Sequence, residues 1–264
     1  MKEQILSQMT TECPWRDTLY WYDTIDSTNT QAKKLAKEGA PAGTVLIAGN
    51  QTGGRGRMGR SFSSPEGMGV YLSAILRPGC KAEELMHLTC AAAVAACKAV
   101  ENVCGIFPGI KWINDLVCGK EKLGGILTEM SVNADGFVDW AVVGIGINCC
   151  QRKADFPKEL QNMATSLLLQ TNKIYPPDLL AAQLTEALFE INNILFQKQQ
   201  IMDIYRQHCI TLGQNILVVR GEESAYGTAL DLDEDGGLLV RFADGTEKVV
   251  SSGEVSIRGM YGYV

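Results

Sequence analysis

Glycine and arginine alternate in residues 53–60 (GGRGRMGR) in a pattern suited to holding an anion. The segment carries Arg55, Arg57 and Arg60, and no acidic residue lies between Gln51 and Ser64. Glycines allow close backbone approach to a ligand, and the guanidinium group pairs with phosphate or carboxylate oxygens. The known phosphate-loop and dinucleotide fingerprints are incomplete here. Taken alone, the pattern predicts either an anion-binding loop or a solvated loop that touches nothing or touches RNA.

A second cluster interrupts an apolar run at Lys111, Asn114 and Asp115. Buried polar and charged side chains are costly unless they have partners. Strand alternation predicts that Lys111 and Asp115 share one face with Ile113, and that Trp112 and Asn114 lie on the other. The pattern is consistent with a ligand site, or with a structural Lys–Asp pair beside an Asn in a turn.

Two further segments carry glycines where a strand is expected. Lys122 is followed by Gly124 and Gly125, which would let a ligand lie against the strand. Residues 144–148 (GIGIN) alternate small and large side chains and end at Asn148. This alternation indicates that another group approaches the strand closely.

The elements that must position these residues can be read from local patterns. An apolar segment from residue 20 leads to a helix that starts at Ser27 or Thr28 and reaches residue 37, with Thr28 and Gln31 matching a capping box. Strands are expected over residues 110–117 and 122–130, joined as a hairpin around residues 118–120. The remaining predictions are strands at 44–48, 69–76 and 138–148, and helices at 81–103, 179–196 and 201–209.

The residue pattern changes after residues 212–213, from long helical and strand segments to short β-rich runs. Five short β-rich runs separated by Asp, Gly and Ser turns fill the remaining fifty or so residues. We therefore expect two domains, residues 1–211 and residues 212–264.

Bulk properties exclude several classes of protein. The net charge of −6 argues against broad, non-specific nucleic-acid binding. The polar N-terminus resembles no signal peptide, and no apolar run approaches the roughly 20 residues of a membrane span. We therefore expect a cytoplasmic protein with no membrane partner.

The nine cysteines are expected to be reduced thiols in packing roles. Cys90, Cys97 and Cys104 are spaced by seven in a predicted helix, which puts neighbours about 10 Å apart. A disulfide requires Cα atoms within about 7 Å, so these cysteines cannot bridge one another.

Five motifs occur in an order and spacing that resemble the biotin protein ligases, also known as biotin–acetyl-CoA-carboxylase ligases. They are DSTN at 26–29, GRGRMGRSFSSPEG from residue 54, KWINDL from 111, KLGGIL from 122 and GIGIN from 144. The resemblance runs from about residue 20 to the C-terminus. It implies an α+β fold: a mixed, largely antiparallel sheet flanked by helices, similar to class II synthetases, with a small C-terminal SH3-like β-barrel.

The resemblance also implies roles for individual residues. Those that match biotin-binding positions are Ser27, Thr28, Gln51, Gly54, Arg55, Arg57, Lys122, Gly124 and Gly125. Those that match the nucleotide side are Arg57, Arg60, Lys111, Asn114 and Asn148. Arg57, Lys111, Asp115 and Lys122 are the expected catalytic residues, and Asp115 is also a candidate Mg²⁺ ligand. Met58 departs from the family, in which a basic residue is common at this position.

The implied activity uses ATP and Mg²⁺ to convert biotin to biotinyl-5′-AMP, and then transfers biotin to a lysine of a carboxylase carrier domain. The expected partner is the biotin carboxyl carrier protein of acetyl-CoA carboxylase, and the protein could be a monomer or a homodimer. Only 25 residues precede Asp26, too few for a helix-turn-helix, so we expect no DNA partner. A lipoate or octanoate ligase of the same fold is the nearest alternative, and a non-catalytic RNA-binding module is a more distant one.

Overall fold

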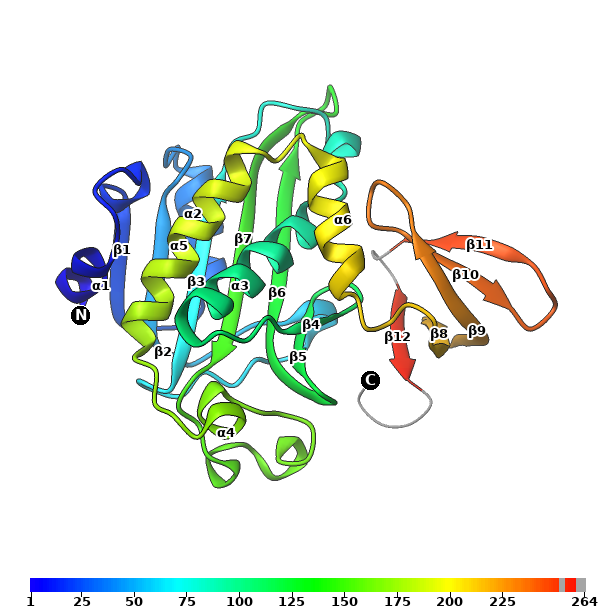
Figure 1. Ribbon diagram of the computed structural model, residues 1–264. Helices are drawn as coiled ribbons and strands as arrows, with labels where there is room; N and C mark the ends of the chain where they lie inside the picture. The colour runs from blue at the N-terminus through cyan, green and yellow to red at the C-terminus, as the bar shows by residue number, and fades with distance from the viewer. Residues whose placement is uncertain (252–254, 260–264) are drawn as a thin grey trace.

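The computed structural model describes residues 1–251 and 255–259, and its strands form two separate sheets (Figure 1). The larger sheet has seven strands in the order β1-β2-β3-β7-β6-β5-β4. β1 pairs with β2 in parallel, and every other neighbouring pair is antiparallel. The bounds are β1 Leu19–Ile25, β2 Val45–Gln51, β3 Gly69–Leu76, β4 Gly109–Lys111, β5 Asp115–Cys118, β6 Glu121–Val132 and β7 Val138–Asn148. This architecture confirms the predicted α+β fold.

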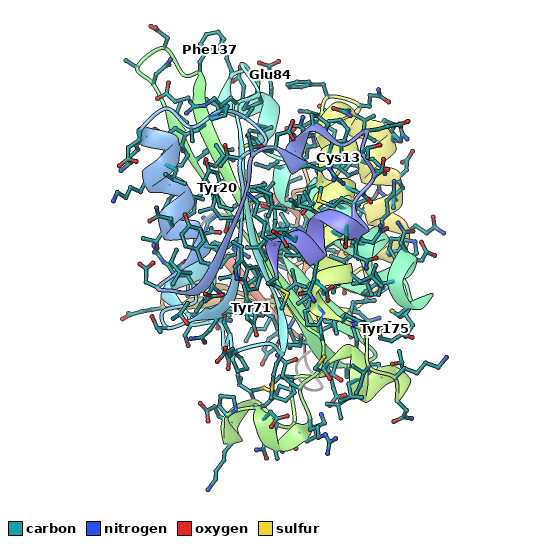
Figure 2. The ribbon with its side chains drawn as sticks, turned by 90° about the vertical axis from the view of Figure 1, so that its left-hand side faces the viewer. Cys13, Tyr20, Tyr71, Glu84, Phe137 and Tyr175 are labelled. Atoms are coloured by element: carbon teal, nitrogen blue, oxygen red, sulfur yellow. The ribbon has the colours of Figure 1, made fainter. Side chains whose placement is uncertain are left out.

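Helices cover both faces of this sheet. Seen along its edge, the sheet lies between α2 on one side and α5 on the other (Figure 2). α2 packs on β2, β3 and β7, whereas α3 and α5 pack on each other and on the opposite face. The α-helices are α1 Lys2–Gln8, α2 Thr28–Lys37, α3 Leu88–Cys104, α4 Leu167–Thr171, α5 Pro177–Asn193 and α6 Lys198–His208. Short 3-10 turns are η1 Pro14–Arg16, η2 Arg57–Gly59, η3 Ala82–Leu85, η4 Lys153–Asp155 and η5 Lys158–Leu160.

The main hydrophobic core lies under α3 and α5. α3 is rich in alanine, and eleven of its seventeen residues are buried, because small side chains let this helix lie close to the sheet and to α5. All eight residues of β3 are buried. Burial on both faces explains why β3 reads as a continuous apolar run rather than an alternating one.

The predicted single helix over residues 81–103 is wrong at its start. The chain forms η3 first, and α3 begins only at Leu88, after His87. The His87 side chain is fully buried, and its Nε2 lies 2.7 Å from the carbonyl oxygen of Leu195. This tertiary contact occurs at the break between the two helical segments.

α2 starts at Thr28 and ends at Lys37, as predicted, but the capping contacts at its start differ from the prediction. Ser27 is the N-cap, and its side chain accepts a hydrogen bond from the amide of Thr30. Thr28 instead contacts Gln51 through its amide and its hydroxyl. The expected Thr28–Gln31 capping box does not form, because Thr28 already lies in the first turn of the helix.

The strand predicted over residues 110–117 is divided by a tight turn. Lys111 at the end of β4 pairs with Asp115 at the start of β5, and residues 112–114 form the turn between them. The Asn114 carbonyl accepts a hydrogen bond from the amide of Ile126, and its side-chain amide donates to the Ile126 carbonyl. The predicted alternation of faces is therefore wrong here, because the chain reverses direction within three residues.

The smaller sheet contains five antiparallel strands in the order β11-β10-β9-β8-β12. The strands are β8 Asn215–Arg220, β9 Glu223–Leu232, β10 Leu238–Phe242, β11 Glu247–Val250 and β12 Val255–Gly259, which confirms the five β-runs expected from the sequence. The domain boundary at residue 212 stays a prediction. Over the described part of the chain, no helix combines the length and apolarity needed to cross a membrane.

Candidate active site

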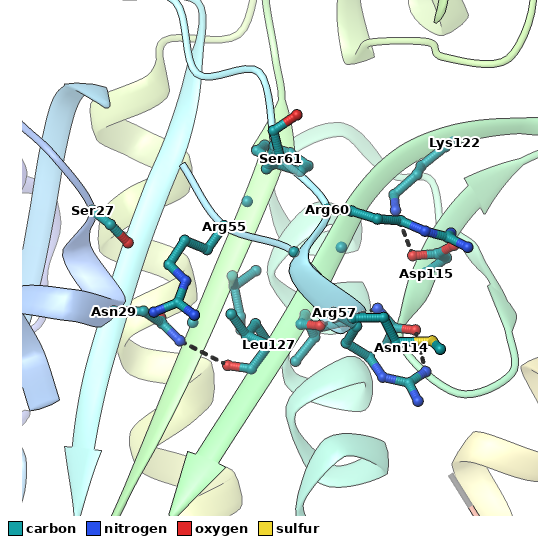
Figure 3. Close-up of a pocket in the computed structure, with 18 of the residues that line it drawn as sticks. Ser27, Asn29, Arg55, Arg57, Arg60, Ser61, Asn114, Asp115, Lys122 and Leu127 are labelled. Atoms are coloured by element: carbon teal, nitrogen blue, oxygen red, sulfur yellow. Dashed lines mark hydrogen bonds and ion pairs between the residues drawn. The ribbon is translucent and has the colours of Figure 1, made fainter. Parts of the chain in front are cut away.

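A pocket of about 600 Å³ opens beside the central strands of the large sheet, within the usual size range for small-molecule sites. Its walls come from the start of α2, the end of β2 at Gln51, the Gly/Arg loop (residues 53–60) with the two residues after it, Leu72 on β3, the turn between β4 and β5, and the strands β6 and β7. Asn162 and Met163 complete the lining. The close-up shows Ser27, Asn29 and Arg55 toward one end, and Asp115 with Lys122 toward the other (Figure 3).

The first end, which we call the polar end, consists of Ser27, Thr28, Asn29 and Gln51. The Gln51 side-chain oxygen accepts hydrogen bonds from the Thr28 amide at 2.8 Å and the Thr28 hydroxyl at 3.1 Å. Gln51 Nε2 donates to the Ser64 hydroxyl at 2.8 Å, which joins the end of β2 to the Gly/Arg loop. These hydrogen bonds orient neutral donors and acceptors, and Arg55 is the charged side chain that lies toward the same end (Figure 3).

Asn29 is held by a set of contacts deep in the site. Its Oδ1 accepts from the Ser73 hydroxyl at 2.6 Å, and its Nδ2 donates to the Leu127 carbonyl at 3.2 Å and to Glu129 at 3.1 Å. A Cβ atom at Gly144 would lie 1.8 Å from Asn29 Oδ1. Gly144 therefore makes room for Asn29, which explains one half of the small-residue alternation in residues 144–148.

Gly146 plays a similar part on the same strand. A Cβ atom there would lie 2.5 Å from the ring of Phe62, which follows the Gly/Arg loop. The Phe62 ring in turn contacts Tyr71 edge-on, with ring centroids 6.4 Å apart. The close approach expected at the GIGIN segment is thus made by two side chains of the protein itself.

The second end, which we call the cationic end, gathers positive charge. Within the described part of the chain, the charged residues that line the whole pocket are five cations and one acid: Arg55, Arg57, Arg60, Lys111, Lys122 and Asp115. Such an excess of positive charge, in a chain whose net charge is −6, favours an anionic ligand.

The groups of the cationic end also contact one another. Lys122 Nζ lies 2.6 Å from Asp115 Oδ1, and Arg57 Nη1 donates to Asn114 Oδ1 at 3.1 Å. Burial lowers the pKa of Lys111 and of Arg57, and the neighbouring Asp115 carboxylate opposes both shifts. A bound anion would favour the charged forms of these side chains and would therefore oppose the effect of burial.

Most residues proposed from the sequence line this pocket: Ser27, Thr28, Gln51, Arg55, Arg57, Arg60, Lys111, Asn114, Asp115, Lys122 and Gly125. Gly54, Gly124 and Asn148 lie outside the lining. A Cβ at Gly54 would lie 2.4 Å from the Phe62 carbonyl, and one at Gly124 would lie 2.4 Å from the Gly146 carbonyl. These glycines allow backbone segments to approach each other. Asn148 is buried and donates to the Thr165 carbonyl at 2.9 Å.

The sequence reasoning missed several lining residues. Asn29 belongs to the DSTN motif but was given no role, although its position beside Ser27 and Thr28 could have suggested one. Asn162 and Met163 carry no motif signal, because they lie in an irregular segment.

A metal site made by protein groups alone does not occur within residues 1–251 and 255–259. No group of three or more His, Cys, Asp or Glu side chains is placed to hold a metal ion in this range. Among the residues that the structure describes, Asp115 is the one carboxylate that lines the pocket, and its Oδ1 is engaged by Lys122.

Comparison with known proteins agrees with this geometry. The model of the Biotin/lipoate A/B protein ligase family matches residues 21–148, and that of the Biotin protein ligase C terminal domain matches residues 211–258. The bifunctional ligase/repressor BirA of Bacillus subtilis is 36% identical over 246 residues, which cover 89% of this chain and 72% of that protein. The biotin–[acetyl-CoA-carboxylase] ligase of Mycobacterium tuberculosis is 33% identical, with 87% of this chain and 85% of that protein covered.

A solved structure is similar over nearly its whole length. The Aquifex aeolicus biotin protein ligase, solved in complex with biotin and ATP, superposes with a TM-score of 0.78 at 31% identity, and the match covers 92% of this chain and 99% of that one. The fold and site therefore define a member of the biotin and lipoate ligase family. Within it, the chain belongs to the biotin protein ligases, since these relatives and the C-terminal domain favour biotin over lipoate.

Proposed function

We propose that this protein is an ATP-dependent biotin ligase that forms biotinyl-5′-AMP and transfers biotin to a lysine of a carrier domain. The observation that carries the proposal is that one pocket joins an end lined mainly by neutral hydrogen-bonding side chains, with Arg55 beside them, to an end where most of the positive charge gathers. Biotin has a polar, uncharged ring system at one end and a carboxylate at the other, and its carboxylate must meet a phosphate. The pocket matches this distribution of charge.

In the first step, a biotin carboxylate oxygen attacks the α-phosphorus of ATP. A carboxyl–phosphate bond forms, the bond to pyrophosphate breaks, and pyrophosphate leaves. Arg57 and Lys122 would offset the repulsion between the two anions and stabilise the negative charge on the phosphate. Ser27, Thr28 and Gln51 would hold the polar ring system, so that the carboxylate faces the cations.

In the second step, a neutral lysine amine of the carrier attacks the biotinyl carbonyl carbon and releases AMP. Asp115 is a candidate to accept the proton that the amine loses, because it is the carboxylate at this end of the pocket.

Mg²⁺ fits this pocket only as a companion of ATP. Magnesium is commonly bound through one or two carboxylates together with substrate phosphates and water. Asp115 supplies one such carboxylate, with Asn114 beside it. Bound Mg²⁺ would neutralise phosphate charge, and the remaining ligands would come from ATP and water.

The acceptor is inferred from chemistry and from the relatives. The Mycobacterium tuberculosis relative is named for acetyl-CoA carboxylase, so the carrier domain of that carboxylase is the expected partner here. A reducing, cytoplasmic location suits a protein whose nine cysteines are all free.

Incubation of the protein with biotin, ATP, Mg²⁺ and a carboxylase carrier domain tests the proposal. The intact mass of the carrier should rise by one biotinyl group, and the rise should require both ATP and the acceptor lysine. Parallel reactions with lipoate or octanoate should give no adduct. An unchanged carrier mass beside an active control ligase would refute the proposal, and an adduct formed with lipoate alone would point to the other branch of the family.

A further inference from the structure

Residues 161–165 form part of the pocket wall although they belong to no helix and no multi-residue strand. Asn162 and Met163 line the pocket beside Lys122. The amide of Lys122 donates to the Met163 carbonyl at 2.7 Å, and the amide of Thr165 donates to the Lys122 carbonyl at 2.8 Å. Both main-chain polar groups of Lys122 are therefore bound to this segment, and its position helps to set where Lys122 lies.

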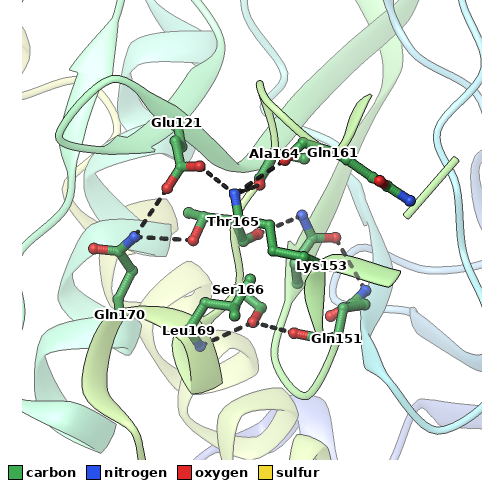
Figure 4. Close-up of polar contacts among 10 residues, drawn as sticks. Glu121, Gln151, Lys153, Gln161, Ala164, Thr165, Ser166, Leu169 and Gln170 are labelled. Atoms are coloured by element: carbon green, nitrogen blue, oxygen red, sulfur yellow. Dashed lines mark hydrogen bonds and ion pairs between the residues drawn. The ribbon is translucent and has the colours of Figure 1, made fainter. Parts of the chain in front are cut away.

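Lys153 holds the outer side of the segment (Figure 4). Its ammonium group donates to the Gln161 carbonyl at 3.1 Å and to the Ala164 carbonyl at 3.0 Å, and forms an ion pair with Glu121. A lysine ammonium has three N–H donors, so these three acceptors account for all of them. The side chain is 44% exposed, and an exposed lysine is seldom ordered by three partners, because ordering it costs conformational entropy.

The inner side of the segment is held as well. Asn148 donates to the Thr165 carbonyl, and Gln151 Nε2 donates to Asn148 Oδ1 at 3.1 Å, which orients the Asn148 amide. On the outer side, Gln170 contacts both the Thr165 hydroxyl and Glu121. Residues 161–165 are thus clamped between the end of β7 and the hairpin that carries Lys122.

We propose that Lys153 is a positioning residue for the cationic end of the pocket. By tying two carbonyls of residues 161–165 to Glu121 on β6, it keeps the Asn162–Met163 wall against the strand on which Lys122 lies. Lys153 is not in the pocket lining, so it acts through this wall. The inference rests on the proposed function, because it assigns the cationic end to ATP.

Replacement Lys153→Met tests this role, since it keeps the length of the stem and removes the three donors. The KM for ATP in biotin-dependent ATP–pyrophosphate exchange should rise about tenfold, the equivalent of one charge-assisted hydrogen bond. The Kd for biotin measured without ATP should rise by a smaller factor, because the biotin ring system is held at the polar end and only its carboxylate reaches Lys122. Lys158 is an exposed lysine between Lys153 and residues 161–165, so Lys158→Met should behave as wild type in both measurements.

A KM for ATP within twofold of the Lys158→Met value would overturn the inference. It would also be overturned if biotin and ATP binding weakened equally as the melting temperature fell, since a general loss of structure would explain that result. If Lys153→Met does not fold, Glu121→Gln tests the same role, and the expected rise in the KM for ATP is smaller. An unchanged KM for ATP would again contradict the role of Lys153. Absence of biotin-dependent exchange in the wild-type protein would refute the proposed function itself, so the two failures are distinguishable.

Discussion

Lys122 lies where the two halves of the proposed reaction meet. Its side chain pairs with Asp115 at 2.6 Å, and its main chain is bound on both sides by residues 163 and 165. Arg57 reaches the same region from the Gly/Arg loop and donates to Asn114. At the scale of single residues, the positive charge of the site comes from lysines on two strands and from the arginines of the Gly/Arg loop.

Loss of the Lys122 charge should stop the first step of the reaction. Lys122→Met should lower the rate of biotin-dependent ATP–pyrophosphate exchange by about 100-fold or more, as expected when a preorganised donor to a developing anion is removed. Lys120→Met, at an exposed lysine in the turn of the same hairpin, is the matched control and should keep full activity. Near-normal exchange in Lys122→Met would remove this residue from the reaction centre.

Arg57 should retain the reactive intermediate rather than select biotin. Arg57→Gly removes the contact with Asn114 and one cation of the loop, so biotinyl-adenylate should dissociate about tenfold faster or more. Released adenylate would label an added bystander protein, and mass spectrometry of that protein measures the effect. Arg57→Lys, which keeps the charge, should show weaker labelling. A variant Arg57→Gly that holds the adenylate as long as wild type would contradict this role.

His87 should make the fold sensitive to acid. Its ring is fully buried, Nδ1 has no hydrogen-bond partner, and burial lowers its pKa, an effect that nearby Lys198 adds to and Asp235 opposes. The unfolded chain, with a histidine pKa of about 6.5, binds the proton more readily. The stability that the neutral ring contributes is therefore present above about pH 6.5 and is lost as the pH falls toward the lowered value.

Titration of His87 alone can change the free energy of unfolding by at most about 1.4 kcal/mol per pH unit. Urea unfolding of wild type and His87→Gln between neutral and mildly acidic pH measures it, because glutamine can keep a donor toward the Leu195 carbonyl without titrating. The variant should show a smaller acid loss than wild type. Parallel pH profiles for the two proteins would show that His87 is not the group responsible.

Strands β6 and β7 shape the pocket through their glycines. Gly144 faces Asn29 and Gly146 faces Phe62, while Gly124 lets β6 approach the Gly146 carbonyl on β7. Side chains at these positions would fill the space that α2 and the Gly/Arg loop now occupy. At the scale of elements, the glycines of β6 and β7 leave space on the sheet, and this space determines where other parts of the chain can approach it closely.

Gly144→Ala should destabilise the protein by about 1–3 kcal/mol, as overpacking of a filled site does, and should weaken biotin binding by displacing Asn29. Asn29→Ala should relieve the clash, so the double variant should be more stable than the sum of the two single effects predicts. Denaturant unfolding of the four proteins gives this coupling energy. Strictly additive effects would show that the two positions do not meet.

The two sheets are joined through the turn that carries the nucleotide-side residues. Trp112 donates from its indole N–H to the Gly236 carbonyl at 2.8 Å, and its amide donates to the Thr211 hydroxyl at 2.9 Å. Lys198 on α6 pairs with Asp235 in the same loop of the smaller sheet. At the scale of the whole molecule, the smaller sheet lies beside α6 (Figure 1), and the loop at residues 235–236 contacts the turn that lines the pocket.

Trp112→Phe should lower the free energy of unfolding by about 1–3 kcal/mol, because it leaves the Gly236 carbonyl buried without this donor. Trp21→Phe is a matched control: the Trp21 indole donates to Asp23 at an exposed position, and its loss should cost about 0.5 kcal/mol or less. Chemical denaturation of the three proteins compares the two costs. Equal costs would mean that the contact between the sheets adds no stability.

The sequence by itself determined the class of fold, and it predicted the chemistry that we propose for the site. Arg55, Arg57, Arg60 and Lys122 could be predicted as anion-binding residues, and all four line the pocket, because motifs and charge can be read along the chain. Strands and helices followed from periodicity, which also depends on near neighbours. The five short strands after residue 212 were found in the same way, since turn residues separate them.

Only the tertiary structure decided which residues meet in the pocket and which serve the backbone. Asn29 reaches Leu127 and Glu129 about a hundred positions along the chain, and no local pattern encodes such a contact. The turn at residues 112–114 is held by Ile126 and Thr211, so strand alternation could not reveal it. The wall at residues 161–165 shows no periodic pattern of apolar residues, because it is not part of a helix or sheet. It is held by the main chain of Lys122 and by the side chains of Asn148 and Lys153.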